Sequence, residues 1–201
     1  QPEDSETAKT EDDKNENNVR NQIEMTIAAL SNDDLYRNND DCKFAYLQLL
    51  RLNVEADTRL GRAFDFSVWE NKSLEHIFPK SKVYHSDEKG KLLDWNDNQL
   101  NKEYINSDTM LDRANFKGNG SEHCIGNLVL LYKPDNSSFS DKLFSEKKKS
   151  YFDMDSLRTF KSRTLLHSMS VFASDSWGVK EIQENKQKVI EEMEEYYGYG
   201  K

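Results

Sequence analysis

The segment at residues 125–132 constrains the fold most, because it is the strongest β-strand candidate in the chain. It reads Ile-Gly-Asn-Leu-Val-Leu-Leu-Tyr, and its apolar and β-branched content is typical of a buried strand. Residues 134–138 then combine proline, aspartate, asparagine and serine, which end strands and form turns. We expect a helix after this turn, over residues 140–151, with Leu143 and Phe144 facing the core and the lysines facing outward.

A second strand candidate, at residues 74–79, carries chemically active side chains. Glu75 and His76 are neighbours there, and Pro79 ends the segment. On an extended strand neighbouring side chains project to opposite faces, so this strand can supply a metal ligand and a base with separate tasks.

Helical spacing of apolar residues predicts helices on both sides of this pair of strands. The first helix covers residues 19–30, and the second begins near residue 40. Two more close the chain, at residues 158–168 and 177–196. Their core positions include Ile23, Ile27, Leu30, Phe44, Leu47, Leu50, Ile182, Val189 and Met193.

The intervening residues 80–120 are rich in lysine, aspartate and asparagine. They hold too many apolar anchors for a plain linker, so we expect short helices packed on the main body. Residues 1–18 carry almost no apolar side chains and a net charge of −5, which predicts a disordered acidic leader or linker.

The order strand, long connection, strand, turn, helix resembles the ββα-metal fold of HNH nucleases. The motif Glu-His-Ile-x-Pro at 75–79, followed by Ile-Gly-Asn-Leu-x-Leu-Leu at 125–131 and Asn-Ser-Ser at 136–138, resembles one branch more closely. That branch is the C-terminal HNH domain of GmrSD-type, modification-dependent restriction endonucleases. The resemblance extends over roughly residues 40–197, although Asn185 stands where this branch favours an arginine.

The resemblance implies a mostly helical α+β domain at residues 19–201. Its ββα-metal core would occupy about residues 70–152, embedded in surrounding helices, with closing helices over 156–197. It also implies a metal-dependent DNA endonuclease that leaves 5′-phosphate and 3′-hydroxyl ends.

The same resemblance assigns roles to four side chains. His76 is expected to be the general base, because imidazole titrates near neutral pH. Glu75 and Asn136 are expected to hold one Mg²⁺, for which Mn²⁺ can substitute, since this ion needs few protein ligands. Asn127 is expected to brace the histidine-bearing loop by hydrogen bonds.

Each role has a structural alternative. His76 could be a core histidine, Asn127 could close a turn after Gly126, and Asn136 could cap a helix. His123, four residues before Asn127, is left open as a further member of the site, because some HNH proteins carry an extra histidine near the metal. His85 and His167 have no supporting pattern.

The net charge of −9 argues against indiscriminate nucleic-acid binding, but the acidity is concentrated at the two ends of the chain. Residues 142–163 form a local basic segment. Within it Lys142, Lys147, Lys148 and Lys149 are candidates for contacts with DNA phosphates. A run of lysines on a helix is also typical of a solvated face.

Cys42 and Cys124 form no CxxC pair, so we expect two buried thiols in a reducing cytoplasm rather than a zinc site or a disulfide. The sequence contains no transmembrane or secretory segment, and no GxxxxGK[ST] loop for nucleotide phosphates. The resemblance therefore places an NTPase or sensor domain upstream of Gln1, and it implies phage or modified DNA as the partner. The alternatives are a catalytically idle DNA-docking module and an RNA-cleaving HNH nuclease.

Overall fold

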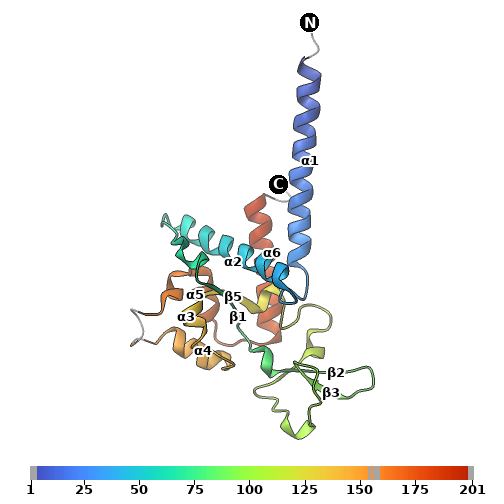
Figure 1. Cartoon of the computed structure of the whole chain (residues 1–201), viewed down its shortest axis with the longest axis vertical. Coiled ribbons are helices and arrows are strands. Elements are labelled where there is room, and N and C mark those ends of the chain that lie inside the picture. Colours follow the sequence, from blue (N-terminus) through green and yellow to red (C-terminus); the bar gives the residue numbers. More distant parts are fainter. Residues whose placement is uncertain (1–3, 154, 156–158, 199–201) are drawn as a thin grey trace.

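The predicted strands pair with each other at the centre of the molecule (Figure 1). The computed structural model describes residues 4–153, 155 and 159–198. Strand β1 (Lys72–His76) lies antiparallel to β5 (Leu128–Tyr132), with His76 opposite Leu128 and Lys72 opposite Tyr132. The fold is a mostly helical α+β arrangement, as the sequence predicts.

Strand β5 is apolar throughout because both of its faces are buried. Val129 and Leu131 lie in one core cluster, with aromatic residues of the helices that follow β5. Leu128 and Leu130 lie in the other, with residues of α2 (Asn39–Arg59) and α6 (Val179–Tyr197). The alternation follows the two-residue period of a strand. Each face therefore anchors a different group of helices.

Two short helices follow β5 directly. The first, α3 (Lys133–Asn136), has a proline in its first turn, where the missing N–H costs nothing. The second, α4 (Phe144–Tyr151), starts later than the predicted residue 140. Asn136 is thus the last residue of α3 and does not cap the longer helix, whose N-cap position is taken by Leu143.

Residues 80–120 differ from the prediction of short helices packed on the body. They contain a three-stranded sheet of β2 (Val83–Ser86), β3 (Leu92–Asp94) and β4 (Leu111–Asp112), in the order β3-β2-β4, together with short 3₁₀ turns. Asp87 and Asp94 accept hydrogen bonds from backbone N–H groups two and four residues ahead of them. Such side-chain bonds stabilise turns in competition with helix, and periodicity alone does not reveal them.

The first helix, α1 (Asp4–Leu30), includes residues 4–18, for which the sequence predicts a disordered leader. Figure 1 shows this part extending away from the rest of the chain. Glutamate and lysine have good helix propensity, so a helix can continue through a segment without a core face. Among residues 15–30 of α1, for which burial is described, only Leu30 is buried.

The closing helices differ from the predictions in their starting points. The helix predicted at 158–168 appears as a 3₁₀ turn (Lys161–Thr164) and α5 (Leu166–Phe172); residues 156–158 lie outside the described part. Helix α6 confirms the predicted apolar face, since Ile182, Val189 and Met193 are all buried.

Both cysteines are free thiols, of which Cys124 is buried and Cys42 is only partly buried. In the portion of the chain that the structure describes, no helix is both long enough and apolar enough to cross a membrane.

Candidate active site

A cleft of about 460 Å³ lies at the carboxyl end of β1. Segments far apart in the sequence line it: the connection between α1 and α2, β1, the loops of the β2–β3 sheet, α3 and α4. Glu75, His76 and Asn136 all line this cleft, whereas Asn127 does not. The lining residues are Tyr36, Ser73, Leu74, Glu75, His76, Pro79, Lys80, Ser81, Trp95, Asn136, Ser140, Asp141 and Lys147.

Glu75 forms a buried ion pair with Lys147 of α4. The Lys147 ammonium lies 2.5 Å from Glu75 Oε1 and donates a hydrogen bond of 2.6 Å to the carbonyl oxygen of His76. Lys147 is fully buried, so the prediction that the lysines of this helix face outward is wrong for this residue. Its place against the end of β1 also does not fit the expected contact with DNA phosphates.

Burial disfavours both charges of this pair. Burial raises the pKa of Glu75, and the positive charge of Lys147 partly offsets this rise. Burial likewise lowers the pKa of Lys147, and the negative charge of Glu75 partly offsets this fall. Each partner therefore depends on the other to stay charged. The pair also fixes the Glu75 carboxylate at the wall of the cleft.

His76 is buried beside the cleft and lies in contact with two other rings. Its Nε2 is 3.0 Å from Nδ1 of His123, and the Tyr36 ring meets it edge-on, with ring centroids 4.5 Å apart. Burial, followed by the charges of His123, Lys80 and Lys147, lowers the pKa of His76 well below its usual value. The imidazole is therefore neutral at physiological pH, as a general base must be before it accepts a proton.

Asn127 is fully buried behind the cleft and holds the chain just after β1. Its Oδ1 accepts a hydrogen bond of 2.8 Å from the backbone N–H of Phe78, and its Nδ2 donates one of 2.9 Å to the Phe78 carbonyl. The Trp177 indole donates a further bond of 3.2 Å to Oδ1. Asn127 is the last residue of the 3₁₀ turn Ile125–Asn127 that precedes β5. Its bonds to Phe78 thus join this turn to the loop that follows His76 at the end of β1.

Gly126 makes this position of Asn127 achievable. A Cβ atom at Gly126 would lie 2.1 Å from the carbonyl oxygen of Ile182 in α6. Only glycine allows the turn to approach α6 this closely. Asn185 of the same helix then donates a hydrogen bond of 2.9 Å to the Gly126 carbonyl.

Asn136 reaches back from α3 to β1. Its Nδ2 donates to Ser73 Oγ at 2.6 Å and to the Leu74 carbonyl at 3.2 Å. Within the described part of the chain Oδ1 makes no hydrogen bond, so this oxygen remains available to a cation. Asn136 therefore contacts β1 at Ser73 and Leu74, and it lines the same cleft as Glu75.

These donors fit a Mg²⁺ site of low protein-ligand number. Glu75 offers a carboxylate and Asn136 an amide oxygen in the same cleft. No cluster of three or more histidine, cysteine, aspartate or glutamate residues that could hold a metal occurs among the described residues. Mg²⁺ commonly keeps several waters and takes only one or two protein carboxylates, so the donor set is compatible with this ion but not with zinc.

The other predicted lysines are spread over the surface. Lys142 donates to the Ser138 carbonyl at 2.8 Å, and Lys148 donates to the Ser174 carbonyl at 2.7 Å. Lys149 is exposed and lines a separate hollow with Phe160. None of the three lines the cleft.

Sequence reasoning missed the cation at the mouth of the cleft, Lys80. Its ammonium lies 4.9 Å from the ring centroid of Tyr36 and 4.7 Å from that of Trp95. A signal for Lys80 was present, because it directly follows Pro79 of the histidine motif. The sequence contains no signal that Tyr36 and Trp95 belong to the cleft, since they come from distant segments and meet only in the folded chain.

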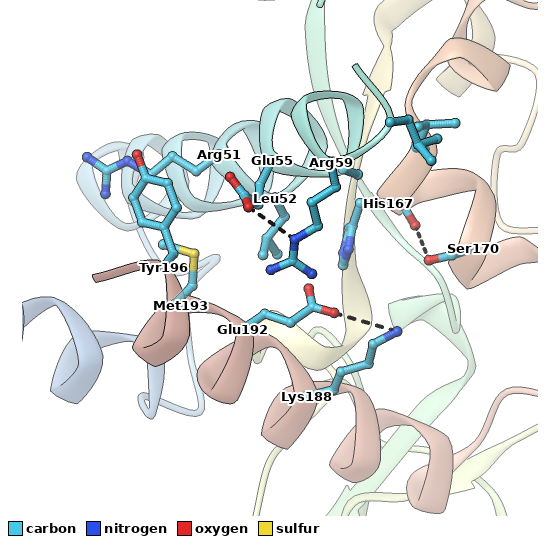
Figure 2. A pocket seen from close by; sticks show the side chains of 13 residues that line it. Arg51, Leu52, Glu55, Arg59, His167, Ser170, Lys188, Glu192, Met193 and Tyr196 are labelled. Atoms are coloured by element: carbon cyan, nitrogen blue, oxygen red, sulfur yellow. Dashed lines mark hydrogen bonds and ion pairs between the residues drawn. The ribbon is translucent and has the colours of Figure 1, made fainter. Parts of the chain in front are cut away.

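A second cavity, of about 270 Å³, lies between α2, α5 and α6 (Figure 2). Two of its ion pairs each lie within one helix, with Arg59 3.0 Å from Glu55 and Lys188 3.8 Å from Glu192, and Arg59 also lies 3.7 Å from Glu195 of α6. His167 is buried at its wall, and burial lowers its pKa to about 4. None of the residues predicted for catalysis, metal binding or DNA binding lines this cavity.

The arrangement described so far defines an α+β protein with a histidine, a carboxylate and an amide in one cleft. The family of GmrSD restriction endonucleases, C-terminal domain, matches residues 20–192, and the chain belongs to this family. It is therefore a nuclease domain of the restriction-endonuclease type. Neither a curated protein nor a solved structure matches the chain.

Proposed function

We propose that the chain is a metal-dependent DNA endonuclease of the HNH type, with His76 as general base and one divalent ion. One observation carries the proposal: Glu75, His76 and Asn136 line the same cleft although they come from β1 and α3. A neutral, buried imidazole beside two oxygen donors suits the hydrolysis of a phosphodiester. The domain that performs it is proposed to comprise residues 19–201.

The chain's own residues would act on water and on the phosphate. His76 takes the proton of the attacking water as its oxygen bonds to phosphorus and the bond to the 3′ oxygen breaks. Asn127 keeps the His76 loop in place. Glu75 and Asn136 would hold Mg²⁺ or Mn²⁺, which when bound supplies positive charge for the phosphate and the leaving oxygen.

DNA is the proposed substrate, in the form of phage or modified DNA. Lys80 lies at the cleft and is the first candidate to contact a phosphate. Lys142, Lys148 and Lys149 are proposed as outer contacts along a longer duplex.

The proposed setting is a bacterial anti-phage restriction system in the cytoplasm. An N-terminal NTPase or sensor domain would select the target, because this chain contains no phosphate-binding glycine loop. A second copy of the chain would supply the second cut of a double-strand break.

Supercoiled plasmid, incubated with the protein and Mg²⁺ or Mn²⁺, tests this function. The expected result is metal-dependent nicking that EDTA abolishes and that His76→Ala lacks. The absence of nicking under all these conditions would favour the idle docking module. Equal cleavage of a matched RNA would overturn the assignment to DNA.

A further inference from the structure

His123 contacts the proposed base directly and has no role in the chemistry derived so far. The two rings are approximately perpendicular, at 76°, and bring His76 Nε2 and His123 Nδ1 within 3.0 Å. We propose that His123 is a positioning residue that holds the His76 ring with its proton on Nε2, so that Nδ1 carries the free lone pair. This inference rests on the proposed function, in which His76 accepts a proton.

The 3.0 Å contact requires one of the two nitrogens to donate and the other to accept. The other nitrogen of His123, Nε2, lies 3.8 Å from Glu122 Oε1. A carboxylate favours the tautomer that turns N–H toward it. The 3.8 Å separation is longer than a hydrogen bond, but the nearby carboxylate still favours a proton on His123 Nε2. His123 Nδ1 is then the acceptor and His76 Nε2 the donor.

The Glu122 side chain, which lies next to His123, is held in one position. It is fully buried and is held by Arg113, whose Nε donates to Oε1 at 3.0 Å. Arg113 therefore fixes the position of the Glu122 carboxylate beside His123. Arg113 follows β4, so the small β2–β3–β4 sheet contributes to the orientation of the catalytic histidine.

His123 is itself held on both sides. Its carbonyl oxygen accepts from Leu35 N–H at 3.0 Å, and its own N–H donates to Ser121 Oγ at 2.9 Å. The Tyr36 ring stacks on the imidazole, with centroids 5.9 Å apart and an angle of 11°. The ring therefore has little freedom to leave His76.

The arrangement also leaves Nδ1 of His76 available. Within the described residues this nitrogen makes no hydrogen bond, while Nε2 is engaged by His123. The proton of the attacking water would pass to Nδ1. If His123 were instead a metal ligand through Nδ1, it would have to break the contact with His76.

Two substitutions of His123 separate these roles. His123→Asn places an amide oxygen close to the position of Nδ1, whereas His123→Leu fills similar space without an acceptor. We expect His123→Leu to lower kcat for plasmid nicking about 10- to 100-fold with KM for DNA unchanged. His123→Asn should restore most of the loss, and His85→Leu, which changes a histidine that does not line the cleft, should leave kcat unchanged.

Nitrogen-15 NMR of the histidine rings at neutral pH provides a readout independent of turnover. In the wild-type protein His76 should show a single tautomer with the proton on Nε2, and His123→Leu should yield a mixture. A proton on Nδ1 of wild-type His76 overturns the proposal, even if the leucine variant fails to fold. An unchanged kcat in His123→Leu also overturns the proposal. A higher Mg²⁺ requirement in His123→Leu with an unchanged His76 tautomer overturns it as well, because that result would indicate that His123 is a metal ligand.

The NMR result also separates this inference from the proposed function. If the wild-type protein nicks no DNA, the nuclease proposal fails, while the tautomer of His76 still decides whether His123 positions it.

Discussion

His76 and His167 are both buried histidines with lowered pKa values, yet their surroundings differ. His76 lines a cleft, with His123 on Nε2 and an ion pair of Glu75 and Lys147 beside it. His167 lines the smaller cavity between α2, α5 and α6, and within the described structure its buried Nε2 has no hydrogen-bond partner. Burial and a lowered pKa are therefore shared by the proposed general base and by a histidine outside the cleft.

The surroundings of His76 and His167 differ in how their charged groups are held. The cleft is lined by an amide and by a carboxylate that a fully buried lysine fixes in place. The cavity contains ion pairs between partly exposed residues one helical turn apart (Figure 2). Pairs of the second kind contribute little to stability and are easily remade in water. Oriented, desolvated groups are what a reaction requires.

The largest effect is expected from the histidines themselves. His76→Ala should lower the nicking rate about a thousandfold or more, because general-base catalysis typically contributes 10²–10⁴-fold. His167→Ala should leave the nicking rate of the folded protein within about threefold of wild type, since it removes only buried contacts. Rates of plasmid relaxation in Mg²⁺ measure both, and equal losses in the two variants would contradict the comparison.

The next effect concerns the two kinds of ion pair. Lys147→Met should reduce the free energy of unfolding by about 3 kcal/mol, because it leaves Glu75 buried without its partner. Lys188→Met, the matched change in the exposed pair with Glu192, should cost less than about 1 kcal/mol. Urea denaturation at neutral pH measures both. Similar urea midpoints for the two variants would show that the buried pair contributes no more to stability than the exposed pair.

The pH dependence of stability should report His167. The pKa of His167 is lowered from 6.5 to about 4 in the folded chain, so between these values the unfolded chain binds a proton that the folded chain does not. Stability therefore falls as the pH drops from about 6.5 to about 4, by up to about 3 kcal/mol from this group. Urea denaturation of wild type and His167→Gln at several pH values tests this, and the variant should lose less stability in acid. Parallel curves would rule out this contribution.

The smallest effect is expected at the amide of the proposed metal site. Asn136→Ala should raise the Mg²⁺ concentration for half-maximal nicking about tenfold, and high Mn²⁺ should restore part of the activity, because one of two protein ligands is lost. Asn185→Ala is the control, since it removes a buried amide that does not line the cleft. An unchanged metal requirement in Asn136→Ala would remove this residue from the site.

The sequence predicted the two central strands, because local patterns encode them. The apolar run of β5 predicts a strand buried on both faces, and the Glu75–His76 pair predicts the edge of a site. The sheet of residues 80–120 was missed, since its strands are short and its turns depend on aspartate side chains that bond to the backbone. Lys147 was assigned to the surface because lysine is rarely buried without a partner, and Glu75, its partner, lies 72 residues earlier.

The sequence by itself determined the candidate site residues: a histidine beside a carboxylate, and two asparagines at fixed places around a buried strand. Only the tertiary structure decided their surroundings. It placed Lys147 against Glu75, set His123 against His76, and put Lys80 between the rings of Tyr36 and Trp95. The reason is physical, since local preferences act over a few residues, whereas desolvation and charge pairing depend on groups that only the folded chain brings together.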